Sequence, residues 1–220
     1  GYDFTGWYSD KALTKRVTSV KLYENMTVYA GWSMRNLPFI DVARGDWFFD
    51  DIRYVYDNGL MNGISSTQFA PYISTTRGMI VTILYRMEGQ PAVSRDCPFA
   101  DVASGSYYER AITWAAANGI VTGHSSTIFA PDANITREQL AAILYRYTIY
   151  KGQDVSVGES TNILSFEDFA SLSEYAIPAM QWACGAGILY GFGGRLLPDA
   201  PANRLQAAAI LHRFCVNTLN

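Results

Sequence analysis

The sequence has few of the residues that build metal and nucleophilic sites, with three cysteines and two histidines among 220 residues. Cys97, Cys184 and Cys215 lack a metal-binding spacing such as C-x-x-C, so we expect no metal and interpret them as thiols that pack like small apolar residues. His124 and His212 lie apart from any serine or cysteine nucleophile pattern, and we expect neither to be catalytic.

Motifs for common catalytic chemistry are also missing. There is no glycine-rich phosphate loop, no HExxH and no nucleophile elbow. Asp50 and Asp51 fall in the first turns of an expected helix, where negative charge is favourable, so a glycosidase carboxylate pair is the weaker interpretation. We therefore expect neither enzyme activity nor a cofactor.

Charge and hydropathy exclude further classes. A net charge of −3 argues against nucleic acid and against bulk attraction to an anionic membrane. No run approaches the roughly 18 apolar residues of a membrane span. A hydrophobic content of 49% permits a packed core. The chain begins in mid-pattern, so we expect it to be a fragment whose N-terminal portion carried other surface-protein domains.

One pattern occurs three times. Each copy opens with Phe-x-Asp, at 39–41, 99–101 and 166–168. An arginine lies 36 residues after each aspartate, in the pairs Asp41 and Arg77, Asp101 and Arg137, and Asp168 and Arg204. Shifted by 60 residues, positions 38–87 match positions 98–147 at 22 of 50 sites. Because repeat units bury their apolar faces against one another, any site built from these residues should occur three times.

Each copy predicts two helices joined by an irregular loop. We expect first helices at roughly 47–58, 107–118 and 174–186, each ended by a glycine in a left-handed C-cap, at Gly59, Gly119 and Gly187. The second helices carry apolar residues at i, i+3, i+4 and i+7. These matching stripes predict a mainly α fold in which three helix-loop-helix repeats, 38–90, 98–150 and 164–217, share one helical core.

The second helices begin with an unusual charge. Thr136 with Gln139, and Asn203 with Gln206, form capping boxes, whereas Thr76 caps without a partner. The first helical position is then an arginine in every copy: Arg77, Arg137 and Arg204. A cation is unfavourable there. Two explanations stay open: pairing with an aspartate of a Phe-x-Asp, or an external anion held by the guanidinium and the free N–H groups.

The aspartates also have two interpretations. Asp41, Asp101 and Asp168 could cap a loop or the first helix, or accept hydrogen bonds from sugar hydroxyls. Aromatic residues follow shortly after them, where exposed rings would suit a sugar face; these are Trp47, Phe48, Tyr107, Tyr108 and Tyr175. We expect about half of these rings to be buried.

These residues resemble the S-layer homology (SLH) family. The likeness rests on the F-x-D-V opening, the N-G-x-x-x-G turn at 58–63 and 118–123, the F-x-P loop and the I-T-R helix start at 135–137. The resemblance covers residues 38 to about 217. It implies a pseudo-threefold assembly that anchors extracellular proteins to the bacterial envelope, commonly by binding pyruvylated secondary cell-wall polysaccharide in grooves between repeats. It associates the I-T-R arginine and the F-x-D aspartate with that groove.

The copies depart from the family pattern to different degrees. The usual acid of I-T-R-A-E is Met79, Gln139 and Gln206 here, and the third copy has a shortened loop at 191–198. Arg137 follows the complete loop at 125–129 and a complete capping box. We therefore expect Arg137 to contribute most to binding and Arg204 least.

Residues 1–32 differ in kind from the repeats. Short β-branched and aromatic segments at 17–23 and 26–30 predict a small strand-rich module. The segments Gly1–Tyr8 and Met26–Trp32 resemble the C-terminal part of an InlB B-type (Listeria–Bacteroides) repeat, which implies an extracellular bacterial setting.

Three functions remain to be compared. The leading hypothesis is a non-catalytic anchor that binds a cell-wall polysaccharide or a peptidoglycan-linked glycan. Its candidate binding residues are Asp41, Trp47, Arg77, Asp101, Tyr107, Arg137, Asp168 and Arg204. The alternative is a structural module that binds protein, with its Arg–Asp pairs internal. A wall-degrading enzyme is the third, and the missing catalytic residues count against it.

Overall fold

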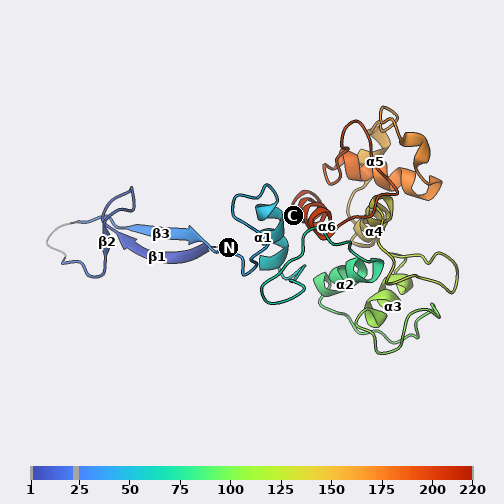
Figure 1. Ribbon diagram of the computed structural model, residues 1–220, viewed down its shortest axis with the longest axis horizontal. Coiled ribbons are helices and arrows are strands. Elements are labelled where there is room, and N and C mark those ends of the chain that lie inside the picture. The colour runs from blue at the N-terminus through green and yellow to red at the C-terminus, as the bar shows by residue number, and fades with distance from the viewer. Residues whose placement is uncertain (1, 22–24, 220) are drawn as a thin grey trace.

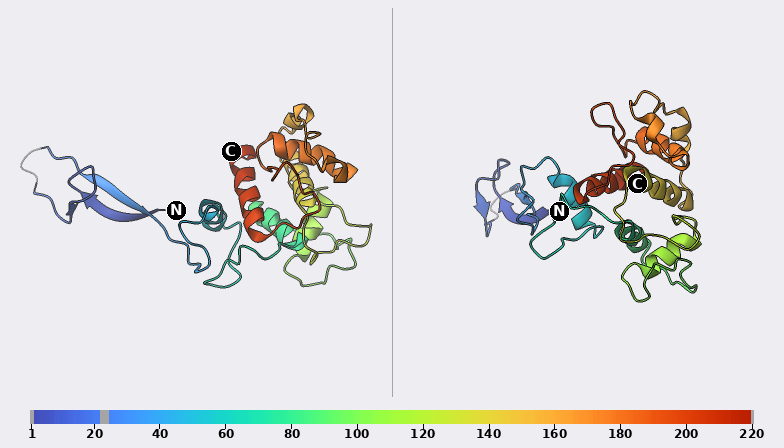
Figure 2. Two further views of the ribbon diagram at one scale, coloured as in Figure 1. Left: turned by 45° about the horizontal axis from the view of Figure 1, so that its top comes forward. Right: turned by 45° about the vertical axis from the view of Figure 1, so that its right-hand side comes forward.

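The computed structural model describes residues 2–21 and 25–219, which form a helical body and a narrow β arm (Figure 1). Among the described residues, no helix is long and apolar enough to cross a membrane. The body confirms the mainly α fold, with three lobes around a common centre (Figure 2, right).

The first helices of the repeats form the outer parts of the lobes. They are α1 (Phe49–Asp57), α3 (Glu109–Ala117) and α5 (Ile177–Gly185). The expected glycines end them with positive φ, +67° at Gly59, +69° at Gly119 and +65° at Gly187. The third begins later than expected: short 3-10 turns, η2 (Phe169–Ser171) and η3 (Glu174–Ala176), precede α5, whose first turn holds Pro178.

The second helices occupy the centre. They are α2 (Arg77–Met87), α4 (Arg137–Tyr150) and α6 (Arg204–Thr218). Both capping boxes are confirmed, and Thr76 caps α2 without a reciprocal partner. One hydrophobic core is continuous through all three repeats. A further 3-10 turn, η1 (Ser156–Ser160), packs on α5.

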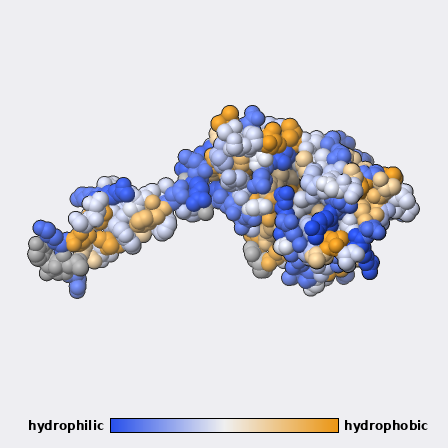
Figure 3. Space-filling view, turned by 90° about the horizontal axis from the view of Figure 1, so that it is seen from below, coloured by the Kyte–Doolittle hydropathy of each residue, from blue (hydrophilic) through white to orange (hydrophobic). Residues whose placement is uncertain are grey.

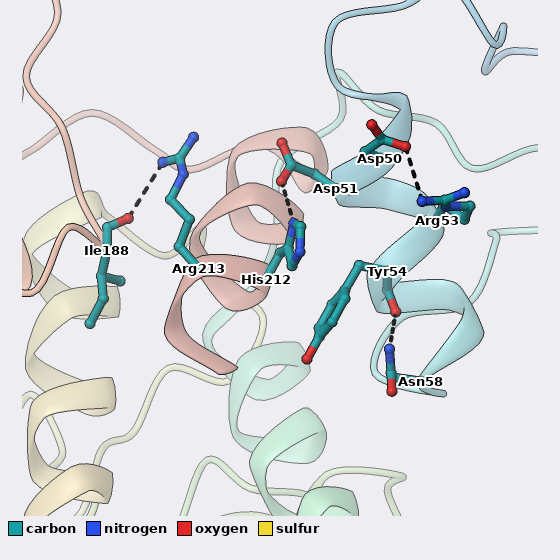
Figure 4. A network of polar contacts seen from close by, with 8 residues as sticks. All are labelled: Asp50, Asp51, Arg53, Tyr54, Asn58, Ile188, His212 and Arg213. Carbon is teal, nitrogen blue, oxygen red and sulfur yellow. Dashed lines mark hydrogen bonds and ion pairs between the residues drawn. The ribbon is translucent and has the colours of Figure 1, made fainter. Parts of the chain in front are cut away.

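Helices pair between repeats rather than within them. The main packing partner of α2 is α3, that of α4 is α5, and that of α6 is α1. The last pair closes the ring between the third and first repeats. There, His212 Nδ1 lies 2.7 Å from Asp51 Oδ1, and the His212 ring stacks on Tyr54 at 4.1 Å (Figure 4).

Three backbone hydrogen bonds join the repeats at the centre. The Thr75 N–H donates to Ala202 O at 2.9 Å, Ile135 N–H to Thr75 O at 2.9 Å, and Ala202 N–H to Ile135 O at 2.8 Å. All three residues are fully buried. The bonds form a closed cycle, which gives the body its threefold character.

The arm is a three-stranded antiparallel sheet that projects from the body (Figure 3). Its central strand β1 (Tyr2–Tyr8) lies between β2 (Arg16–Val17) and β3 (Tyr29–Met34). The prediction of a strand at 17–23 is wrong for residues 18–21, which lie outside β2, and residues 22–24 lie outside the described part of the chain. The expected strand at 26–30 begins only at Tyr29. The Asp10 carboxylate accepts the N–H groups of Thr14 and Lys15, and this turn brings only Arg16 and Val17 beside β1.

Because the three repeats share one core, a small cavity in that core should lower the free energy of unfolding of the helical body substantially. Ile80 and Ile143 are 0% and 3% exposed. Ile80→Ala and Ile143→Ala should each lower the free energy of unfolding by about 2–5 kcal/mol, measured by urea denaturation. Ile40, which is 80% exposed, provides the matched control: Ile40→Ala should change stability little. Equal stability of all three variants would contradict the proposed packing.

Candidate functional site: grooves at the repeat junctions

The arginines at the starts of the second helices, which we call the I-T-R arginines after the motif at 135–137, reach across the junctions between repeats. They are Arg77, Arg137 and Arg204. Arg77 Nε donates to Phe129 O at 2.9 Å and its Nη2 to Thr122 O at 3.2 Å. Arg137 does the same to Leu196 O at 2.9 Å and Tyr190 O at 2.8 Å. Each guanidinium thus holds the loop of the following repeat.

Arg204 completes the cycle, because its guanidinium donates to Phe69 O and Asn62 O of the first repeat. The three arginines are 5–8% exposed. Arg77 and Arg204 also lie over the rings of Phe129 and Phe69, each at 4.5 Å. These partners explain an arginine at a helix start, since carbonyl dipoles offset the unfavourable position of the charge.

The free N–H groups of these helix starts are occupied as well. Arg77 N–H donates to Ala133 O at 3.0 Å, and Gly78 N–H to Pro131 O at 2.8 Å. The equivalent groups of α4 and α6 also donate to carbonyls of the next repeat's loop. The part of the anion hypothesis that relied on free backbone N–H groups is therefore wrong.

The F-x-D aspartates hold the same loops from the other side. Asp101 accepts from Phe129 N–H at 2.8 Å and Ala130 N–H at 2.6 Å. Asp41 and Asp168 hold the equivalent pairs of their own loops, 69–70 and 196–197. The loop-cap interpretation is confirmed, and the helix-cap interpretation is wrong. Among the described residues the carboxylates form no ion pair with the I-T-R arginines, so Arg–Asp pairing, the first of the two explanations left open for these arginines, is wrong.

Two of these aspartates have shifted acidities. Desolvation by burial acts to raise the pKa of Asp101, but the hydrogen bonds from Phe129 and Ala130 N–H outweigh it, so the pKa is lowered. The pKa of Asp168 is lowered by the same balance, with Leu196 and Leu197 as donors. Both carboxylates are ionised at neutral pH.

A groove of about 360 Å³ lies at the junction that Arg77 spans, and we name it the Arg77 groove. Its walls come from all three repeats: Arg77 from the first, Thr122, His124 and Arg146 from the second, and Tyr175 from the third. Gln139, Ala142 and Ile143 form its floor along α4.

Charge is concentrated in the Arg77 groove. Burial is the largest cause that lowers the pKa of Arg77, the positive charge of Arg146 lowers it further, and the carboxylate of Asp101 acts to raise it. Both guanidinium groups stay charged at neutral pH. Within the described residues neither forms an ion pair with a carboxylate, so an anion placed between them would relieve their repulsion.

The equivalent Arg204 groove has a volume of about 220 Å³ and a more apolar lining. Arg204 and Arg86 supply its charge, and Tyr107 of the second repeat forms one wall. Met79 replaces Gln139, and Met61 adds a further apolar side chain. This groove therefore exposes less polar surface to a sugar.

The Arg137 junction differs from the other two. The Arg213 guanidinium, equivalent to Arg146, lies 4.9 Å from the centroid of the Tyr190 ring and donates to Ile188 O at 3.4 Å (Figure 4). Arg137 contacts the shortened third loop instead of the loop at 125–129 that precedes it. The reason for expecting Arg137 to dominate binding is therefore wrong, since the complete loop belongs to the Arg77 groove.

The aromatic residues divide as expected. Phe48 and Tyr108 are buried, whereas Trp47, Tyr107 and Tyr175 are 76%, 59% and 50% exposed. Tyr107 and Tyr175 line grooves, and Trp47 packs edge-on against Phe48 at 5.4 Å.

Sequence reasoning missed the second arginine of each junction, which lines the groove at the Arg77 and Arg204 junctions. Arg86, Arg146 and Arg213 each lie nine residues after an I-T-R arginine. This triplicated spacing could have revealed them, because an arginine recurring at one helical position indicates a shared role.

The described residues contain no group of three or more His, Cys, Asp or Glu placed to hold a metal. The described cysteines are all free, and burial raises the pKa of Cys184 and Cys215 to about 11.

Comparison with known proteins agrees with this architecture. The S-layer homology domain model matches residues 38–78, 98–141 and 165–208, which together form more than half of the chain. An endoglucanase from Bacillus sp. (strain KSM-635) is 35% identical over 175 residues, covering 79% of this chain and 18% of that protein.

Surface-layer proteins are also similar. The surface-layer 125 kDa protein of Lysinibacillus sphaericus is 33% identical over 122 residues, 50% of this chain and 10% of that protein. The S-layer protein of Bacillus licheniformis is 24% identical over 174 residues, 79% of this chain and 19% of that protein. The chain thus spans less than a fifth of each relative. The family and these surface proteins indicate an extracellular location at the cell surface.

The loop-holding aspartates predict a defined pH dependence. Asp101→Asn should lower the free energy of unfolding at pH 7 by about 1.5–3 kcal/mol, the usual loss for hydrogen bonds to a charged group. A lowered folded pKa contributes stability that is present above the unfolded pKa of about 3.9 and is lost as pH falls through the folded value. The difference from wild type should therefore shrink below about pH 4.

Urea denaturation at several pH values measures this difference. Asp96→Asn removes an exposed carboxylate as a matched control and should have little effect. A constant difference between Asp101→Asn and wild type from pH 7 to pH 3 would contradict the assignment.

Proposed function

Because this chain belongs to the S-layer homology family, we propose that residues 38–217 anchor a surface protein to the bacterial envelope by binding an anionic cell-wall polysaccharide. The polysaccharide occupies the junction grooves, and its acidic group is a pyruvate ketal. The Arg77 groove is the main site. The arm at residues 2–34 is part of an InlB B-type module.

One observation carries the proposal: the Arg77 groove presents two guanidinium groups that lack a carboxylate partner among the described residues. Arginine offers planar, paired donors that match a carboxylate. A ketal-linked pyruvate supplies such a carboxylate on a sugar ring.

The other walls of the Arg77 groove suit the sugar itself. Tyr175 is half exposed and presents an aromatic surface, which favours the apolar face of a sugar ring. The hydroxyl of Thr122 and the side chain of Gln139 offer polar groups for sugar hydroxyls. Asp41, Asp101 and Asp168 act indirectly in this proposal, because their oxygens hold the loops that shape the grooves.

The alternative function is a protein-binding structural module with internal Arg–Asp pairs. Its structural premise is absent, since the arginines donate to carbonyls and the aspartates accept N–H groups. The charged Arg77 groove favours the polysaccharide.

Residues 38–217 should hydrolyse nothing. The name endoglucanase describes a whole relative of which this chain covers 18%. Incubation of the chain with purified cell walls should release no reducing sugar above the rate of a heat-denatured sample. A sustained release would contradict a purely binding role.

Arg146 provides the sharper test of polysaccharide binding, because it contributes to the groove without holding a loop by two carbonyl bonds. Arg146→Ala should weaken binding to purified wall polysaccharide about 10-fold or more, as for loss of one charge-assisted contact of roughly 1.5–3 kcal/mol. Arg95→Ala removes an exposed arginine outside the grooves and should bind as wild type. Isothermal titration calorimetry gives the affinities.

Chemical removal of the pyruvate ketals from the polysaccharide distinguishes binding of the pyruvate carboxylate from binding of another anionic group of the wall. Loss of wild-type binding after this treatment is expected. Equal affinity of Arg146→Ala and wild type would contradict the groove as the site, and unchanged binding after ketal removal would show that another wall anion is recognised.

A further inference from the structure

Glu138 is a buried acid without a counterpart in the other repeats. It follows Arg137 at the start of α4, where the first repeat has Gly78 and the third has Leu205. Its side chain is only 4% exposed. A buried carboxylate requires partners, because desolvation of an unpaired charge is costly.

The partners of Glu138 all belong to the third repeat. Its Oε1 accepts from Ser173 Oγ at 2.8 Å and from Tyr175 Oη at 3.0 Å. Its Oε2 accepts from Ser173 N–H at 3.1 Å. The carboxylate therefore fixes the backbone and two side chains of the segment that forms the third wall of the Arg77 groove.

Tyr175 is the residue through which Glu138 reaches the groove. Burial, followed by the charge and hydrogen bond of Glu138, raises the pKa of Tyr175 to about 12. The hydroxyl therefore remains a donor to Glu138 at neutral pH, while half of the residue stays exposed. An aromatic ring held in place loses little conformational entropy when a ligand binds.

The other junctions lack this arrangement. At Gly78 a Cβ atom would lie 3.0 Å from the Tyr108 ring, so the space that an acid would need is filled. Tyr108 donates instead to Asp132 at 3.2 Å, and the groove-lining Tyr107 has no buried acid as a partner among the described residues. The third repeat has an apolar leucine at this position.

We propose that Glu138 is a positioning residue that holds Tyr175 across the Arg77 groove and makes this groove bind the polysaccharide more tightly than the Arg204 groove does. This inference rests on the proposed function. The negative charge of Glu138 lies near an anion site, so a purely electrostatic view predicts that its removal would tighten binding. The positioning role predicts that removal weakens binding. The three hydrogen-bond donors already neutralise much of the carboxylate's charge, and without Glu138 the Tyr175 wall of the groove is no longer held in place.

The test compares Glu138→Gln, Tyr175→Phe and the double variant by calorimetry with purified wall polysaccharide. Each single change should weaken binding about 5- to 20-fold. The double variant should bind no more weakly than the weaker of the two single variants, because both changes act on the same contact between residues 138 and 175. Glu174→Gln removes a neighbouring exposed carboxylate and should stay within about twofold of wild type.

A spectroscopic readout separates positioning from general stability. In protein labelled with 3-fluorotyrosine, the fluorine resonance missing from Tyr175→Phe belongs to residue 175. Polysaccharide should shift this resonance in wild type, and Glu138→Gln should shift it without ligand, whereas Glu174→Gln should not. Thermal melts in parallel confirm that each variant is folded at the temperature of the measurement.

The outcomes are distinguishable from failure of the proposed function. If wild type binds no wall polysaccharide, the proposed function fails. If Arg146→Ala loses binding but Glu138→Gln and Tyr175→Phe bind as tightly as wild type or tighter, only the positioning role of Glu138 is overturned. Additive losses in the double variant would also overturn it.

Discussion

The cycle of three backbone hydrogen bonds among Thr75, Ile135 and Ala202 is the constraint on which the helical body depends. A helix start has N–H groups that need acceptors outside the helix. The neighbouring repeat supplies acceptors for the first two N–H groups of α2, α4 and α6, and the cycle does the same for the residue before each N-cap. Removal of one repeat would leave buried donors without acceptors, which is costly. We therefore expect the three copies to fold as one unit, with their helices paired across the junctions.

The same constraint shapes the grooves. Each F-x-P-type loop is held by an aspartate of its own repeat and by an arginine of the preceding one, which bind opposite sides of the same residue. The next helix and a wall from the following repeat then complete a groove, so that three repeats contribute to it. The residues that build the assembly thus also place a guanidinium in the groove. The three junctions differ because the surrounding residues differ: Glu138 and Gln139 at the Arg77 groove, methionines at the Arg204 groove, and the Tyr190 ring on Arg213 at the Arg137 junction.

Local patterns in the sequence were sufficient to predict the helices, the glycines that end the first helices and the caps of the second helices. These features depend on residues close together in the chain. The triplicate motif was sufficient for the repeat architecture. The junctions could not be predicted in the same way: the partners of Arg137 lie 53 and 59 residues further along. Intervals within a repeat suggested Arg–Asp pairing, whereas packing placed each arginine on its neighbour's loop. The short strands of the arm were partly misplaced, since pairing with β1 decided them more than β-propensity did.

Polysaccharide binding in the Arg77 groove can be examined in a crystal structure of the chain with a purified fragment of wall polysaccharide. We expect an acidic group between the guanidinium groups of Arg77 and Arg146, with a sugar ring against Tyr175. The hydrogen bonds from Arg77 to the carbonyls of residues 122 and 129 should be unchanged. A fragment bound on the outer surface of the lobes, with the Arg77 groove empty, would show that the groove is not the binding site.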